Sequence, residues 1–67
     1  MGIHDTPLAK LPLSPRTLNA LLRGHITQVG QVLVMSDEEL IRIRNFGERC
    51  LIELDQKLAE MNLERGQ

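Results

Sequence analysis

The chain has 67 residues, a mass of 7.6 kDa and a net charge of −1, and 42% of its residues are hydrophobic. A chain of this length forms one small domain that buries roughly 60% of the surface its unfolded state exposes, which argues against a large enzyme cleft. The charge is not that of a protein held on nucleic acid by overall electrostatic attraction, so any such role must rest on local charge.

Residue usage narrows the fold and the chemistry further. Phe46 is the one aromatic residue, so the core must be aliphatic, which favours helices and argues against modules that stack bases on aromatic rings. One cysteine and two histidines complete neither a disulfide nor a zinc site, and we predict no metal and no cofactor. No apolar run approaches the roughly 20 residues of a membrane span, and no signal peptide pattern is present. We therefore predict a cytoplasmic protein without a membrane contact.

The segment before the first helix is predicted to be extended. Residues 1–10 contain a proline and show no sustained period, which indicates a lead-in or linker remnant with room for one helical turn. Leu11 and Leu13 are expected to fold back on the first helix.

The first helix is predicted to begin after Ser14, the N-cap, with Pro15 at its first position, and to end at Gly24 as C-cap. A helical wheel places three leucines on the inward side: Leu18, Leu21 and Leu22. The opposite, outward side holds Arg16, Asn19, Ala20 and Arg23.

Two short helices are predicted next. Thr27 is a plausible cap for the first of them, which would turn Val29, Val32 and Leu33 inward. The second has a clearer start, because Ser36 and Glu39 have the spacing of a capping box and its first turn is acidic. Capping explains these acids, so we assign them no catalytic role.

The last helix is predicted from a repeat of apolar residues and runs to about Asn62. The repeat consists of Leu51, Leu54, Leu58 and Met61. The whole chain is predicted to be all-α, a compact bundle of four to five short helices over residues 11–63, with a polar tail at 64–67.

The strongest local signal lies between the last two helices and resembles a helix-hairpin-helix. In residues 43–51 an apolar helix end is followed by a short turn, Gly47 and a new helix. Gly47 would let a partner's backbone come close, and the free N–H groups of the new helix favour an anion such as a DNA phosphate. Arg44 and Arg49 flank the turn and are candidates for charge-assisted hydrogen bonds to neighbouring phosphates. The alternative is an ordinary turn that uses glycine for conformational reasons.

The outward side of the first helix gives a second signal. Arg16, Asn19 and Arg23 recur at i, i+3 and i+7, and such residues reach base edges or a narrow minor groove. The alternative is a solvated helix face. Cys50, at the start of the last helix, is interpreted as a half-buried structural thiol.

In combination, "SPRTLNALL" at 14–22 and "IRNFG" at 43–47 resemble the C-terminal domain of the bacterial RNA polymerase alpha subunit. The resemblance implies a helical domain that binds the minor groove of A+T-rich promoter DNA and contacts activators and sigma factor. It also implies a flexible linker to the rest of the polymerase.

The resemblance assigns roles to individual residues. It gives DNA contacts to Arg16 and Asn19 on the first helix, to Asn45 and Gly47 in the hairpin, and to Arg49 after it. It gives a phosphate-bonding position to Cys50. Glu53 would orient an arginine.

Three positions depart from the family pattern: Ala20, Glu48 and Cys50. Ala20 stands where some members carry a cysteine. Glu48 stands where a lysine often adds charge and Cys50 where a small hydroxyl residue can bond a phosphate, so both should weaken DNA binding. Lys10 and Pro12 replace an acidic patch that relatives offer to sigma factor.

Two other functions compete with this one: a helical protein–protein module without DNA binding, and a hairpin module of a repair protein. An enzyme has no support, because no nucleophile–base pair or metal set is found. The DNA-binding hypothesis requires the polar side of the first helix and the Gly47 bend to form one surface.

Overall fold

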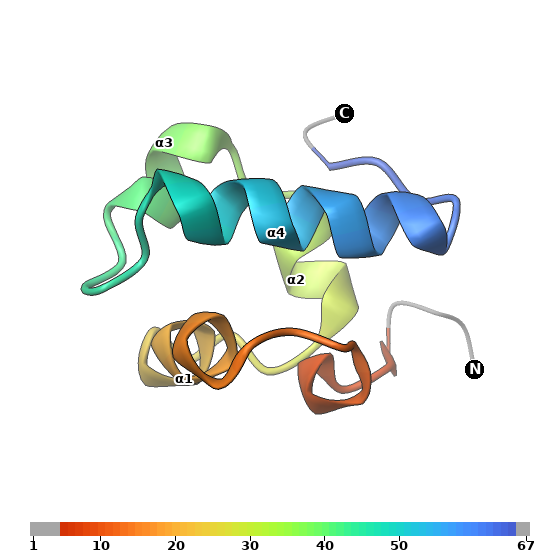
Figure 1. Ribbon diagram of the computed structural model, residues 1–67, viewed down its shortest axis with the longest axis horizontal. Coiled ribbons are helices and arrows are strands. Elements are labelled where there is room, and N and C mark those ends of the chain that lie inside the picture. The colour runs from red at the N-terminus through yellow and green to blue at the C-terminus, as the bar shows by residue number, and fades with distance from the viewer. Residues whose placement is uncertain (1–4, 66–67) are drawn as a thin grey trace.

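The computed structural model describes residues 5–65, and it is helical, as predicted. A 3-10 turn, η2, precedes four α-helices (Figure 1). The elements are η2 (Leu8–Lys10), α1 (Pro15–Arg23), α2 (Val29–Leu33), α3 (Asp37–Ile41) and α4 (Glu48–Glu60). Over residues 5–65 the one extended pairing is an isolated antiparallel bridge between Pro7 and Gln28.

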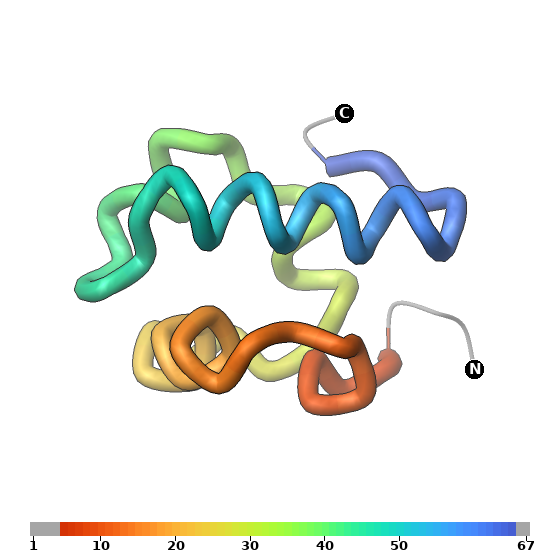
Figure 2. Tube along the Cα trace, in the orientation of Figure 1, coloured from red at the N-terminus to blue at the C-terminus, as the bar shows by residue number. Residues whose placement is uncertain are grey.

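The longest helix, α4, organises the others. It packs against both α1 and α3. Figure 2 shows α1 almost end-on while α4 runs across the page, so the two helices cross steeply, with α3 behind the start of α4. Among the described residues, no helix combines the length and the apolar character that crossing a membrane would require.

Local capping explains where two of the helices begin. The Ser14 hydroxyl accepts a hydrogen bond from the Thr17 N–H at 3.4 Å at the start of α1. At α3, Ser36 and Glu39 bond each other's backbone N–H groups at 3.2 and 2.9 Å, which confirms the capping box.

The cap predicted for α2 is wrong. Gln28, not Thr27, is the N-cap of this helix. The reason is that the Gln31 side chain reaches back and accepts from the N–H groups of Thr27 and Gln28, at 2.8 and 3.0 Å. These donors are thereby satisfied without a threonine hydroxyl.

Gly24 is the C-cap of α1, as predicted. Glycine is needed here because it is small and not because of its backbone conformation. Its backbone is not left-handed; that conformation falls on His25, with φ 65°. A Cβ added at Gly24 would lie 3.3 Å from Cγ2 of Ile43, so the small residue lets the end of α1 pack against the segment that leads into the hairpin.

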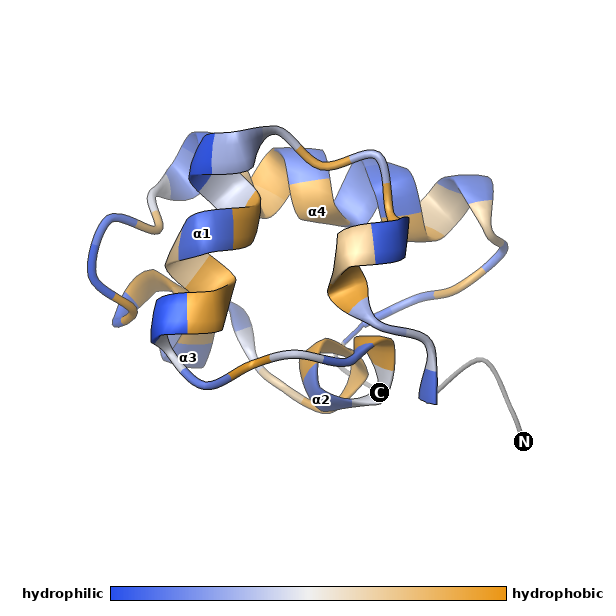
Figure 3. Ribbon diagram, turned by 90° about the horizontal axis from the view of Figure 1, so that it is seen from below, coloured by the Kyte–Doolittle hydropathy of each residue, from blue (hydrophilic) through white to orange (hydrophobic). Residues whose placement is uncertain are grey.

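The predicted faces of α1 need a correction at two residues. Ala20, predicted outward, is 2% exposed, whereas Leu22, predicted inward, is 41% exposed. The cause is Thr17, which is buried because its hydroxyl donates to Glu53 and so turns its own side of the helix inward. Arg16, Asn19 and Arg23 lie on the outward side as predicted, and all three are exposed. In Figure 3 the hydrophobic side of α1 faces the interior.

The core is aliphatic, with Phe46 as its one ring, and every element contributes to it. Its members are Leu8, Leu11, Ala20, Leu21, Ile26, Val29, Val32, Leu33, Leu40, Phe46, Cys50, Leu54 and Leu58.

Part of the predicted lead-in belongs to this core. Leu8 is fully buried, its N–H donates to the Thr27 carbonyl at 2.8 Å, and the Val29 N–H donates to the Thr6 carbonyl at 2.9 Å. The packed unit therefore reaches back before the boundary predicted at Leu11. Residues 1–4 of the predicted lead-in lie outside the described residues.

The end of the chain is also more ordered than a polar tail implies. α4 ends at Glu60, two residues before the predicted Asn62, because Asn62 is left-handed and the Leu63 N–H turns back to the Leu58 carbonyl at 2.9 Å. Arg65 then binds groups on α3 and α4. Residues 66–67 of the predicted tail lie outside the described part.

Candidate nucleic-acid interface

The polar side of α1 and the hairpin share one surface. Two adjoining hollows meet at Arg16. We call the one toward the start of α1 the first hollow; Ser14, Arg16, Gly47, Arg49 and Glu53 are among its lining residues. The second hollow is lined by Arg16, Asn19, Ala20, Arg23 and Asn45. The geometric prediction on which the DNA-binding hypothesis depends is therefore confirmed.

Glu53 fixes the start of α1 from the middle of α4. Its carboxylate accepts hydrogen bonds from the Ser14 N–H, from the Ser14 hydroxyl at 3.0 Å and from the Thr17 hydroxyl at 2.6 Å. These bonds hold residues on both sides of Arg16, so the backbone under Arg16 is attached directly to α4.

The role predicted for Glu53 was to orient an arginine. Over residues 5–65 the hydrogen bonds of its carboxylate go to Ser14 and Thr17, and no ion pair joins it to an arginine. Its effect on Arg16 is thus exerted through the helix start. Partial burial alone would raise the pKa of Glu53, but the hydrogen bonds from Thr17 and Ser14 outweigh it and lower the pKa below its ordinary value.

The hairpin turn does not need glycine at position 47 for its own conformation. The left-handed residue is Asn45, with φ 67°, whereas Gly47 has φ −101° and ψ −175°, which any residue adopts. A Cβ added at Gly47 would meet nothing within 4 Å. The alternative of a conformational glycine therefore fails at this position, and the space above Gly47 is open to a partner.

The start of α4 adjoins this open space. Gly47 is the N-cap, and the helix start has no hydrogen bond from a capping side group. The first N–H groups of an α-helix have no partner within the helix, and the dipole of a 13-residue helix makes this end attractive to an anion.

The surrounding positive charge is not neutralised. Within the described range, none of Arg16, Arg23, Arg44 and Arg49 forms an ion pair, and all four are exposed. Arg44 lies beside the turn but lines neither hollow, whereas Arg16 and Arg49 line the first. Glu48, also in the first hollow, is an opposing charge.

Cys50 is more buried than predicted. Its side chain is part of the core, the residue is 6% exposed, and the Sγ lies 4.0 Å from the Asn45 carbonyl oxygen. The thiol therefore supports the turn from inside.

Sequence reasoning missed Ser14 and Thr17 as parts of this site. Ser14 was identified only as a helix cap, and no local pattern links it to Glu53, which is 39 residues away. No group of three or more potential metal-binding residues gathers anywhere in residues 5–65.

Comparisons with a family model and with individual proteins point to the same family. Residues 2–60 match the family model for the C-terminal domain of the bacterial RNA polymerase alpha subunit. The chain is 48% identical over 61 residues to the DNA-directed RNA polymerase subunit alpha of Herpetosiphon aurantiacus, and the match includes 91% of this chain and 18% of that protein.

Two further relatives have the same name. The subunit of Roseiflexus castenholzii is 48% identical over 87% of this chain and 18% of its own length. That of a Nitratiruptor species is 43% identical over 96% of this chain and 20% of its own length. The chain thus spans about a fifth of these relatives.

Proposed function

Because this chain belongs to the family formed by the C-terminal domains of bacterial RNA polymerase alpha subunits, we propose that it binds the minor groove of A+T-rich DNA upstream of promoters. The observation that carries the proposal is the single surface on which Arg16 and the open position above Gly47 adjoin. The proposed role is non-catalytic.

Arg16 would enter the minor groove, with Asn19 beside it. A narrow A+T-rich groove has an enhanced negative potential, and a guanidinium inserted there gains from it. The backbone under Arg16 is held by Glu53 through Ser14 and Thr17, so the helix start needs little further ordering on binding.

The start of α4 would hold a phosphate of the groove wall. The uncapped N–H groups supply donors, Gly47 puts no side group in the way, and Arg49 adds a charge-assisted contact. Each phosphate contact contributes about 0.9 to the slope of log K against log salt. With few contacts, and with Glu48 opposing them, affinity should be modest.

Weak binding is useful if the domain is tethered. We propose that a flexible linker joins it to the rest of the polymerase in the cytoplasm and raises its effective concentration near the promoter. Transcription activators and sigma factor are the proposed protein partners, although Lys10 and Pro12 remove one acidic route to sigma factor.

A titration with A+T-rich duplex, followed by chemical shifts, tests the proposal. Binding should move the backbone signals of Arg16, Asn19 and Gly47, and a G+C-rich duplex should move them less. Arg16→Ala should weaken binding without changing the melting temperature, because the arginine is exposed. If A+T-rich duplex leaves Arg16 and Gly47 unmoved, the domain is a protein-binding module instead. Equal shifts with both duplexes would favour the repair-type hairpin.

A further inference from the structure

The second hollow shares Arg16 with the first but is not lined by Gly47, and the phosphate site in the first hollow does not use it. Its polar lining comes from two elements: Asn19 and Arg23 on α1, and Asn45 in the hairpin. The two elements are joined here, because Gly24 packs the end of α1 against Ile43. Arg23 therefore stands at a fixed place on the same surface as Arg16.

Arg23 has an available charge. It is exposed, and no carboxylate within residues 5–65 pairs with it. A positive charge in the last turn of α1 interacts favourably with the helix dipole. This interaction does not explain why Arg23 lines the same hollow as Arg16 and Asn45.

The spacing of Arg16 and Arg23 along α1 exceeds the width of the minor groove. Arg16 and Arg23 are seven residues apart, which at 1.5 Å per residue is about 10 Å along the helix axis. The minor groove is about 6 Å wide and narrower in A-tracts. With the guanidinium of Arg16 in the groove, Arg23 would therefore lie outside it, near a phosphate at the groove's edge.

We propose that Arg23, with Asn45 beside it, binds a phosphate of the strand opposite the one held at the start of α4. The surface then clamps both walls of the minor groove, with Arg16 between them. This inference rests on the proposed DNA binding and deepens it. It also makes Arg23 a specificity-determining residue, because both clamps engage together only where the walls are close.

Salt-dependent titrations of an A+T-rich duplex test the clamp. Arg23→Ala should lower affinity by up to about fivefold, as expected for an exposed ion pair, and should reduce the salt slope by about 0.9. Arg23→Lys should keep the slope. Arg42→Ala is the matched control, since Arg42 is exposed and lines neither hollow. Its slope should equal that of the parent.

Duplexes with uncharged methylphosphonate linkages on one strand at a time identify the wall that each residue contacts. The parent should lose affinity with either strand neutralised. Arg23→Ala should become less sensitive than the parent to neutralisation of one strand, and Arg49→Ala less sensitive to neutralisation of the other. An Arg23→Ala variant with the slope of the parent, or one that stays as sensitive as the parent to both strands, would overturn the clamp.

The outcomes also distinguish a failure of the clamp from a failure of the proposed DNA binding. If the parent binds and Arg16→Ala binds more weakly, but Arg23→Ala matches Arg42→Ala, the clamp fails and DNA binding stands. If the parent does not bind the duplex at all, both fail together.

Discussion

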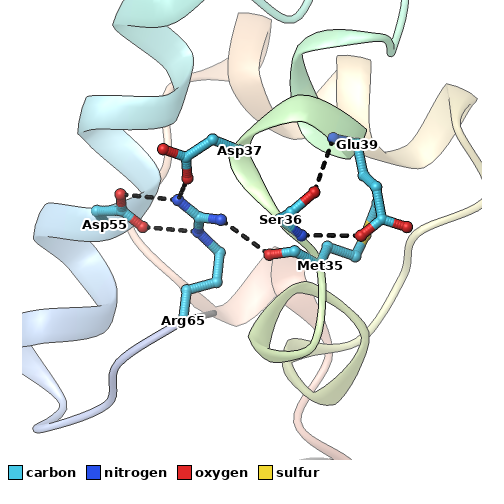
Figure 4. A network of polar contacts seen from close by, with 6 residues as sticks. All are labelled: Met35, Ser36, Asp37, Glu39, Asp55 and Arg65. Carbon is cyan, nitrogen blue, oxygen red and sulfur yellow. Dashed lines mark hydrogen bonds and ion pairs between the residues drawn. The ribbon is translucent and has the colours of Figure 1, made fainter. Parts of the chain in front are cut away.

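Arg65 and Asp55 form a two-pronged ion pair, with Nε and Nη2 of the guanidinium 2.8 and 3.0 Å from the two carboxylate oxygens (Figure 4). The same guanidinium donates to the Met35 carbonyl at 2.9 Å and binds Asp37. Its side chain is 6% exposed. Arg65, which follows the last helix, therefore connects α4 to the start of α3.

Removing this connection should cost stability. We expect Arg65→Ala to lower the free energy of unfolding by about 1–2 kcal/mol, because a buried charge-assisted network is lost while the carboxylates stay partly solvated. Arg65→Lys should recover little, since an ammonium group cannot make the two-pronged contact. Urea unfolding measures both. The matched control is Lys57→Ala, which removes an ion pair to the exposed Glu60 and should cost under about 0.5 kcal/mol. Equal losses in the two alanine variants would contradict the assigned role of Arg65.

Glu53→Gln should reveal a pH-dependent contribution. Because hydrogen bonding lowers the folded-state pKa of Glu53 below its ordinary value of about 4.5, the carboxylate stabilises the fold above that pH. The contribution is lost as the pH falls through the folded-state pKa. The parent should therefore unfold at a higher temperature than Glu53→Gln at pH 7, and the two melting temperatures should converge as the pH falls through the folded-state pKa. A difference that persists unchanged into acid would show that the charge is not involved.

Gly47→Ala separates folding from binding. The added methyl group meets nothing within 4 Å and the backbone is extended, so the melting temperature should hardly change. Affinity for A+T-rich duplex should fall, because the methyl group would fill the open space that the proposed phosphate contact uses. Fluorescence anisotropy and a thermal melt on the same sample measure both. Undiminished affinity would remove the start of α4 from the interface.

Leu54→Ala should act on the fold alone. Leu54 is fully buried, and truncation should cost about 2–5 kcal/mol through lost burial and a cavity. Ile52→Ala, on the same helix, is the control because Ile52 is 52% exposed, and it should cost less than about 1 kcal/mol. Calorimetry that found equal losses would remove Leu54 from the core.

The sequence predicted what local chemistry determines. The capping box at Ser36 and the cap at Ser14 follow from short-range spacing, and both are present. The apolar repeat likewise located α4 and its buried residues Leu54 and Leu58. The shared surface of α1 and the hairpin was inferred from the family pattern.

Contacts between distant segments were not predictable in this way. The helical wheel placed Ala20 and Leu22 on the wrong sides of α1. The hydrogen bond from Thr17 to Glu53 joins residues 36 positions apart, and such a contact does not affect the periodicity of the sequence. Leu8 was placed in an extended segment because a single apolar residue shows no period, although it is fully buried. The left-handed residue of the hairpin is Asn45 and not Gly47, which residue type alone did not indicate.

The position of η2 has a consequence for how the domain is held. In Figure 1 this turn, drawn in red, lies in the right half of the molecule, whereas the hairpin lies at the left end of the 30 Å long axis. The described part of the chain therefore begins away from the hairpin. The proposed linker, attached at that place, would leave the hairpin free to contact the proposed duplex.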